Sequence, residues 1–448
     1  MKKTRFTKII ALCLSAALLL SGMVFSASAA ETAVRYWGDV NNDQKVNSQD
    51  ALMILKHAVE ITELTDEQKA AADYDGGGII NSADALVVLK MAVGILPLEE
   101  LTSEEVPGDV DYSKKTVTMQ SIESQIRLLG RTVAEGKDSI RFDWAASGFE
   151  IALYCQGDVT FNMRPDGKIG RIGVVVDGDE ENIKMITTVS GDHEYTAAED
   201  LPKGKHTIKI VKIQEAKEGC AVMNSITFSG ELAERPADKE LKIEFYGDSI
   251  TSGYGSEESR DTAGGNSRLN LNSNGYTTYA GVAARALDAD FSVISASGYG
   301  LIASFSGGHF NIPDVSGYSD WAGKQTWDFK NNPVDIVVVN LGTNDGNAGA
   351  DKPTPTEFKA KVVDFTEELR GRYPDASIIW VSGMMGSNSL QKTISGTVTE
   401  INKTDANVYY ASLPRGINGV DGHPSTTEQA RAGRVLTQFI EKNILQDK

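Results

Sequence analysis

Residues 242–255, KIEFYGDSITSGYG, contain the turn on which the interpretation of this chain depends. A run of β-branched and aromatic residues ends abruptly at Gly247-Asp248-Ser249, and a polar segment with further glycines follows. The pattern predicts a strand that ends in a sharp turn with Ser249 at its tip. A serine in that position suits a nucleophile, a phosphate-binding loop or a helix N-cap. The phosphate-binding loop is the weakest of the three, because the segment has neither the Lys-Ser/Thr pair of a P-loop nor the glycine spacing of a dinucleotide site.

Strands and helices alternate after Pro236. Continuous apolar strands separated by helices indicate an α/β domain, with a parallel sheet covered on both faces. In such sheets ligands bind at the carboxyl ends of the strands. The strands are expected at 241–246, 291–296, 334–341, 377–381 and 408–411, and the helices at 276–287, 356–373, 389–402 and 426–443.

Four polar or small residues follow separate strands and are expected to meet at that edge: Ser249, Gly298, Asn344 and His423. A serine hydroxyl becomes a nucleophile when a base such as imidazole removes its proton. The oxyanion of the tetrahedral intermediate needs fixed donors, for which the backbone N–H groups of Ser249 and Gly298 and the amide of Asn344 are suitable. His309, after a glycine-rich turn, is a rival base; it ranks lower because it follows the second strand instead of the last.

These blocks resemble a known family. GDSI, the glycine of SASGYG, GTND and GHPS are similar to the four sequence blocks of the SGNH (GDSL-type) hydrolases. The resemblance implies a flavodoxin-like three-layer domain over residues 236–448, with Ser249 as nucleophile, His423 as base, and Ser249, Gly298 and Asn344 as the oxyanion hole. A β-domain directly before it, together with DGHPS, more narrowly resembles carbohydrate esterase family 2, whose members deacetylate plant polysaccharides such as xylan and glucomannan.

One position departs from the hydrolase pattern. Most SGNH enzymes place an aspartate three residues before the catalytic histidine, where this chain has Val420, and Asp421 lies two residues before it. Either Asp421 completes a triad or a backbone carbonyl orients the histidine of a Ser-His dyad, and the sequence leaves both open. Trp321, in the long 304–332 segment, is a candidate sugar platform, or it packs beneath a loop.

Residues 112–235 show short alternating strands with Gly and Asp turns, which predict an antiparallel β-sandwich, with a jelly roll as the expected form. The segment before it, residues 98–111, is acidic, and this composition predicts a linker.

Two similar segments lie nearer the N-terminus, Asp39–Ile61 and Asp73–Ile95, offset by 34 residues. Oxygen-bearing residues recur at the spacing of a calcium loop, in which position 7 offers a backbone carbonyl. The expected ligands are Asp39, Asn41, Asp43, Lys45, Asn47 and Asp50 in the first loop, and Asp73, Asp75, Ile79, Asn81 and Asp84 in the second.

The pair resembles a type I dockerin over residues 36–97, which implies structural Ca²⁺ and a cohesin domain of a scaffoldin as partner. The second copy has Gly77 at loop position 5, which offers no side-chain oxygen, so weaker calcium binding is expected there. The resemblance assigns cohesin selection to Ser48, Gln49, Ser82 and Ala83, which are otherwise first-turn helix residues.

The remaining features concern location and partners. Residues 1–29 combine basic residues, an apolar run and a small-residue cleavage site, which predicts a signal peptide and secretion. The formal net charge of −18 argues against nucleic acid, and no segment is long enough to predict a membrane span. Cys155 and Cys220 either form a disulfide or remain buried thiols.

Together these features predict a secreted, cellulosome-associated esterase that removes O-acetyl groups from hemicellulose without a catalytic cofactor. The alternatives are an SGNH lipase or thioesterase, and a carbohydrate-binding or assembly component without turnover.

Overall fold

A computed structural model describes residues 36–59, 61–74, 80–96, 107, 109–385 and 389–446, apart from the side chains of residues 66, 67 and 389. The predicted signal peptide, most of the linker, and Asp75, Gly77 and Ile79 of the second loop lie outside these residues. The chain divides into two compact units, the first comprising residues 1–74 and 80–102 and the second comprising residues 75–79 and 103–448.

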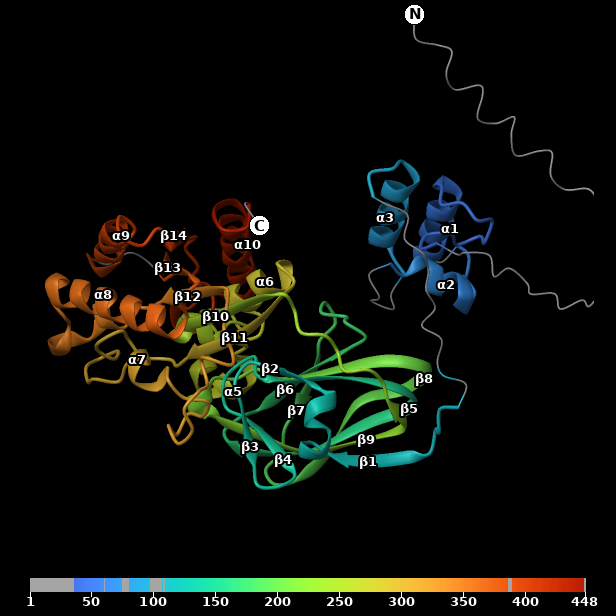
Figure 1. Cartoon of the computed structure of the whole chain (residues 1–448), viewed down its shortest axis with the longest axis horizontal. Coiled ribbons are helices and arrows are strands. Elements are labelled where there is room, and N and C mark those ends of the chain that lie inside the picture. The colour runs from blue at the N-terminus through green and yellow to red at the C-terminus, as the bar shows by residue number, and fades with distance from the viewer. Residues whose placement is uncertain are drawn as a thin grey trace, which may run out of the picture. The chain divides into compact units, whose positions relative to one another are not determined.

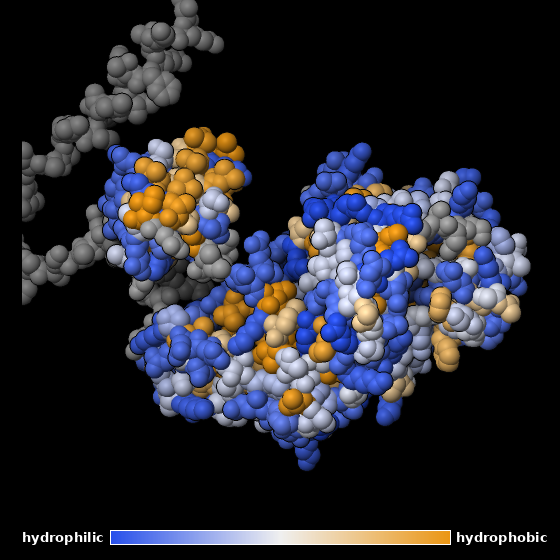
Figure 2. Space-filling view, turned by 180° about the vertical axis from the view of Figure 1, so that it is seen from behind, coloured by the Kyte–Doolittle hydropathy of each residue, from blue (hydrophilic) through white to orange (hydrophobic). Residues whose placement is uncertain are grey.

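Within its described residues, the first unit contains three helices, α1 (Ser48–Ala58), α2 (Asp66–Ala72) and α3 (Ser82–Ala92). Asn47 and Asn81 cap α1 and α3, each in a reciprocal capping box with the aspartate three residues later. Ile54 and Val88 are buried between the helices, as their apolar spacing predicts. Other apolar residues of the two copies stay exposed, and Figure 2 shows apolar side chains gathered on one face of this unit.

Antiparallel strands form the first part of the second unit, here called the β domain. Its sheet has the order β3-β4-β9-β5-β8-β6-β7, with β1 paired to β9 and β2 paired to β5. Register shifts interrupt the long β5 near Gly157, so it bends around a core of buried aliphatic and aromatic side chains. The antiparallel architecture is confirmed, while the jelly-roll topology stays a prediction. The strands are β1 (Lys114–Thr118), β2 (Arg127–Leu129), β3 (Thr132–Glu135), β4 (Ser139–Phe142), β5 (Gly148–Gly167), β6 (Arg171–Val176), β7 (Lys184–Thr187), β8 (His193–Lys212) and β9 (Gly219–Leu232).

A five-stranded parallel sheet of order β11-β10-β12-β13-β14 forms the rest of the unit, here called the α/β domain. Helices α6 and α10 cover one face, and α8 and α9 cover the other (Figure 1). This confirms the parallel sheet expected from the continuous apolar strands. The elements are β10 (Leu241–Gly247), α4 (Ser249–Ser252), α5 (Leu269–Asn272), α6 (Tyr279–Ala286), β11 (Ala289–Ser295), α7 (Ile312–Val315), β12 (Ile336–Asn340), α8 (Pro355–Arg372), β13 (Ser377–Gly383), α9 (Ser389–Ile401), β14 (Val408–Leu413) and α10 (Thr426–Asn443).

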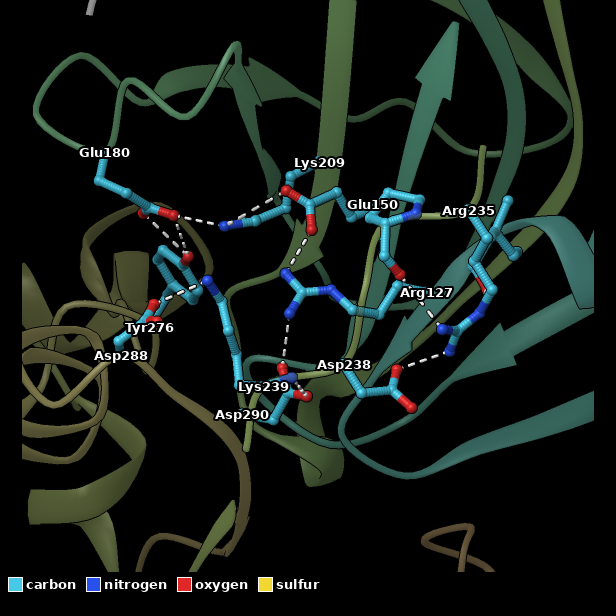
Figure 3. Close-up of polar contacts among 12 residues, drawn as sticks. Arg127, Glu150, Glu180, Lys209, Arg235, Asp238, Lys239, Tyr276, Asp288 and Asp290 are labelled. Carbon is cyan, nitrogen blue, oxygen red and sulfur yellow. Dashed lines mark hydrogen bonds and ion pairs between the residues drawn. The ribbon is translucent and has the colours of Figure 1, made fainter. Parts of the chain in front are cut away.

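The β domain and the α/β domain share their cores. Trp144 and Ala216 of the β domain pack into the core beneath α8 and α9, and Val211 and Ile213 pack into the core beneath α6 and α10. Around this apolar contact runs a chain of ion pairs from Glu180 through Lys209, Glu150 and Arg127 to Asp290 (Figure 3). The β domain is therefore built against the α/β domain.

Cys155 and Cys220 are free, buried thiols, so the disulfide alternative is wrong. Burial raises the pKa of the Cys155 thiol to about 12 and that of Cys220 to about 11. Among the described residues, no helix combines the length and the apolar character that crossing a bilayer requires.

Candidate active site

Ser249 lies at the tip of the turn between β10 and α4, as the sequence of residues 242–255 predicts. Asp248 is the N-cap of α4, and its Oδ1 accepts a hydrogen bond from the Ile250 N–H at 2.9 Å. Ser249 is thus the first residue of the helix, where a backbone N–H has no intrahelical acceptor. Gly247 makes the tight turn possible, because a Cβ there would come within 2.0 Å of the Thr251 hydroxyl oxygen. Both the hydroxyl and the N–H of Ser249 are therefore available at the carboxyl edge of the sheet.

His423 is the imidazole that contacts the serine. Its Nε2 lies 2.8 Å from Ser249 Oγ, and its Nδ1 lies 3.1 Å from the Val420 carbonyl oxygen. When Nδ1 carries the proton and donates it to that carbonyl, Nε2 is left as the acceptor for the serine proton. The rival base His309 is exposed, in the loop after β11. The structure thus pairs Ser249 with His423, the histidine after the last strand.

Asp421 contacts Tyr254. Its Oδ2 accepts a hydrogen bond from the Tyr254 hydroxyl at 3.0 Å. The Tyr254 ring in turn lies over the His423 ring, with 4.3 Å between centroids and 32° between planes. The carboxylate therefore acts on His423 through its charge and through the tyrosine, while His423 Nδ1 donates its hydrogen bond to the Val420 carbonyl oxygen. Sequence reasoning missed Tyr254, because its contacts with His423 and Asp421 join residues that are far apart in the sequence.

Two further groups expected in the oxyanion hole lie at the ends of the neighbouring strands. Gly298 follows β11 with φ +85°, a conformation that favours glycine, and a Cβ placed there would meet nothing within 4 Å. The Asn344 amide nitrogen donates one N–H to the Tyr299 carbonyl at 2.7 Å, and a primary amide has a second. Asp345 fixes this loop, since its carboxylate accepts the N–H groups of Leu301, Ile302 and Ala303.

Trp321 is half-buried near this edge. It packs edge-on against Trp144 at 5.8 Å and tilted against Tyr299 at 5.4 Å, measured between ring centroids. Two other aromatic side chains of the same segment are more open, with Phe305 60% and Phe310 64% exposed. An aromatic surface is thus present beside Gly298, and its exposed members are the two phenylalanines that sequence reasoning missed.

The titration of His423 leads to a prediction about pH. Burial lowers the pKa of His423 to about 4, against the opposing effects of the Val420 carbonyl and the Asp421 charge. Because the base must be deprotonated, kcat/KM for an acetyl ester is expected to stay nearly constant as the pH falls from 7 to about 5, and to fall near pH 4. An ordinary histidine would give a midpoint near about 6.5. A pH–rate profile measures this midpoint, and one at the ordinary value would contradict the prediction.

The first loop predicted to bind calcium, residues 39–50, has the chemistry of a hard-cation site. Asp39 and Asp50 are buried, and their carboxylates accept N–H groups of the loop, as Asp43 does. Burial, with the charges of Asp39 and Asp43 adding to it, raises the pKa of Asp50. A divalent cation would relieve this repulsion, so the donor set fits calcium. In the described part of the chain, no three His, Cys, Asp or Glu side chains converge on one point as a formed metal cluster.

Comparison with known proteins identifies three domains. The sequence matches the models of the carbohydrate esterase 2 N-terminal domain (residues 128–236), the GDSL-like lipase/acylhydrolase family (245–432) and the dockerin type I domain (37–91).

Individual relatives agree with these matches. The cellulase/esterase CelE of Acetivibrio thermocellus is 31% identical over 426 residues, which is 92% of this chain and 50% of CelE, so the chain spans about half the length of that relative. An acetylxylan esterase / glucomannan deacetylase of Cellvibrio japonicus is 25% identical, over 73% of this chain and 91% of its own length. A solved family two carbohydrate esterase from Clostridium thermocellum, in complex with cellohexaose, is 28% identical with a TM-score of 0.64, covering 70% of this chain and 98% of that one.

Proposed function

Because this chain belongs to carbohydrate esterase family 2 and carries a type I dockerin domain, we propose that it is an esterase that removes O-acetyl groups from plant hemicellulose. The observation that carries the proposal is the 2.8 Å contact between His423 Nε2 and Ser249 Oγ at the carboxyl edge of the parallel sheet. The substrates suggested by the relatives are acetylated xylan and acetylated glucomannan.

The reaction proceeds in two steps through an acetyl-enzyme. Ser249 Oγ attacks the acetyl carbonyl carbon while His423 Nε2 takes the hydroxyl proton. The oxyanion is held by the N–H groups of Ser249 and Gly298 and by the second N–H of the Asn344 amide. Collapse breaks the ester bond, and His423 returns the proton to the departing sugar oxygen. Water, deprotonated by the same histidine, then attacks the acetyl-serine. The bond to Ser249 Oγ breaks, acetic acid is released, and His423 returns the proton to Ser249 Oγ.

The role of Asp421 follows from its contacts. The Val420 carbonyl holds the Nδ1 proton, so the pair Ser249–His423 is proposed as a dyad, with Asp421 as an electrostatic helper. For the sugar chain, the exposed rings of Phe305 and Phe310, beside the half-buried Trp321, offer apolar faces on which pyranose rings can stack.

Acetate release tests the substrate. The full chain is incubated with acetylated xylan, acetylated glucomannan and, in parallel, long-chain acyl esters and an acyl thioester. The proposal expects acetate from at least one polysaccharide and little hydrolysis of the long-chain substrates. Preference for the long-chain substrates would support a lipase or thioesterase instead. Absence of turnover on every ester, including a chromogenic acetate, would leave a binding or assembly role as the better account.

The N-terminal unit is proposed to attach the enzyme to a cohesin. Ser48, Gln49, Ser82 and Ala83 are exposed in the first turns of α1 and α3. Apolar side chains that repeat with the same 34-residue offset are also exposed, which is unusual on a free surface and typical of a binding site (Figure 2). These are Leu52 and Leu86, Leu55 and Leu89, Val59 and Val93, and Ile61 and Ile95. A dockerin with these features is expected on an extracellular cellulosome component.

Calcium removal should separate attachment from catalysis. A chelator is expected to abolish capture of the full chain by an immobilised cohesin and to lower its helical circular dichroism, because folding of such loops depends on the metal. Hydrolysis of a chromogenic acetate should stay within about twofold, since the catalytic residues belong to the other unit. The matched pair Asp50→Ala and Asp84→Ala compares the loops, and the first should weaken calcium binding more. Equal losses would contradict a weaker second site.

A further inference from the structure

A short turn of the β domain reaches the end of strand β11. It lies between β8 and β9 and includes one 3₁₀ turn, Ala216–Glu218. Glu215 Oε2 accepts a hydrogen bond from the Ser297 N–H at 2.5 Å, and Lys217 Nζ donates one to the Ser297 carbonyl oxygen at 2.8 Å. The two side chains also pair with each other, with 3.8 Å between Lys217 Nζ and Glu215 Oε1. Two charged side chains of the β domain thus form hydrogen bonds with the backbone of one residue of the α/β domain, Ser297.

Ser297 precedes the glycine that is proposed to bind the oxyanion. The carbonyl of Ser297 and the N–H of Gly298 belong to the same peptide group, which is planar and trans, so they point in opposite directions. A contact that fixes the carbonyl therefore fixes the direction of the N–H. In the described part of the chain, the Gly298 N–H donates to no other group, and the space beyond its α-carbon is open. The lysine contact thus sets the direction of a free donor at the catalytic edge.

The charge of Lys217 adds to this geometric effect. An ammonium group bound to a carbonyl oxygen draws electron density from the peptide and makes its N–H a stronger donor. Glu215 holds the preceding peptide, so two successive peptide groups are fixed before substrate arrives. Donors that need no reorganisation during the reaction are the ones that stabilise an oxyanion most.

The turn itself is firmly anchored. Lys212 is fully buried, and its Nζ donates to the carbonyl oxygens of Gln214 at 2.5 Å and Glu215 at 3.0 Å. Just after β8, the Ile213 carbonyl oxygen accepts a hydrogen bond from the Gly275 N–H of the α/β domain at 2.7 Å. Glu215 is 5% exposed, so its carboxylate has little freedom to move. These contacts make the turn a rigid support.

We propose that Lys217 and Glu215 of the β domain are positioning residues for the oxyanion hole, acting through the Ser297–Gly298 peptide. The inference rests on the proposed function, since it assumes that Ser249 attacks a carbonyl whose oxygen then lies against Gly298. The inference gives the β domain a part in catalysis, whereas its sequence predicted only a fold of antiparallel strands.

The experiment uses the full chain and three variants: Lys217→Met, Lys217→Arg and, as a matched control, Lys184→Met. Lys184 is also a β-domain lysine whose ammonium donates to a backbone carbonyl, that of Ala197 at 3.4 Å. Each protein is assayed on a chromogenic acetate for kcat and KM. Each is also titrated with a fluorophosphonate, in which Ser249 Oγ bonds to phosphorus, fluoride leaves, and His423 takes the proton. The phosphoryl oxygen tests the same donors without any polysaccharide.

Lys217→Met is expected to lower kcat and the phosphonylation rate by about tenfold, with KM nearly unchanged. This decrease is smaller than the decrease in kcat that follows the complete removal of an oxyanion donor. Lys217→Arg should recover most of this, and Lys184→Met should match wild type. Rates for Lys217→Met within twofold of wild type, or a higher KM with unchanged kcat, would overturn the inference. The unfolding temperature of each variant is measured as well. A lower kcat for Lys217→Met that is accompanied by a lower unfolding temperature, and that Lys217→Arg does not recover, would also overturn the inference. A wild type that is phosphonylated but hydrolyses no acetylated polysaccharide would instead contradict the proposed substrate alone.

Discussion

Ser249→Ala is expected to lower kcat for acetyl ester hydrolysis by about 10⁴-fold or more, and Asp421→Ala by less than about tenfold. The serine forms the covalent intermediate, so its loss leaves only what binding and the oxyanion donors contribute. Asp421 has a smaller part because His423 Nδ1 donates its hydrogen bond to the Val420 carbonyl oxygen, and this contact is retained with alanine at 421. The residual rates on a chromogenic acetate, with unfolding temperatures as a check on integrity, measure both effects.

Two further variants separate triad from dyad. His423→Ala should lose about as much as Ser249→Ala, since nucleophile and base act as one unit. Tyr254→Phe keeps the ring over His423 and removes the hydroxyl that bonds Asp421, so it should resemble Asp421→Ala. If Asp421→Ala instead fell to the level of His423→Ala, the carboxylate would be the group that orients the histidine, and the dyad would be contradicted.

Much of the α/β domain was predictable because its signals are local. The helix expected at 426–443 matches α10, and the strand expected at 241–246 differs from β10 by one residue. Apolar continuity indicated parallel strands, and the carboxyl-edge rule then grouped Ser249 with His423 across 174 positions of sequence. Local patterns combined with a topological rule were enough for this pair.

Other features depend on contacts that no local pattern encodes. Tyr254 matters because its ring and hydroxyl meet His423 and Asp421, which follow the last strand. Lys217 lies in the β domain, and only the packing of that domain brings its ammonium to Ser297. In the first unit, Ile54 of α1 is buried, whereas Leu52 and Leu55 of the same helix are exposed. Periodicity finds an apolar face, and it does not say whether the partner of that face belongs to the same chain.

The junction between the β domain and the α/β domain is expected to depend on Arg131. This side chain is fully buried, and its guanidinium forms a bidentate pair with Glu244 of β10, at 3.1 and 2.8 Å. It also donates to the carbonyls of Ser316 and Tyr318, in the segment that leads to Trp321. Burial tends to raise the pKa of Glu244, but the Arg131 charge and the hydrogen bonds from Arg131, Tyr246 and Ser292 together outweigh it, so the pKa is lowered.

Arg131→Met is therefore expected to lower the free energy of unfolding by about 3–5 kcal/mol at pH 7, because Glu244 is left as a buried charge without its partner. The pKa of that carboxyl should then rise above its unfolded value, so the deficit should shrink as the pH falls from 7 to 5 and the carboxyl takes a proton. Denaturant unfolding at both pH values measures the deficit and its trend.

The control is Lys239→Met, which removes the 2.7 Å ion pair with Asp288 seen in Figure 3. Asp288 is 82% exposed in that pair, so the loss should be under about 1 kcal/mol and insensitive to this pH change. A double variant, Arg131→Met with Glu244→Gln, should recover part of the lost stability at pH 7, since it no longer buries a charge. An Arg131→Met deficit as small as that of Lys239→Met would mean that shared apolar packing, to which Trp144 and Val211 contribute, holds the two domains together without help from the buried pair.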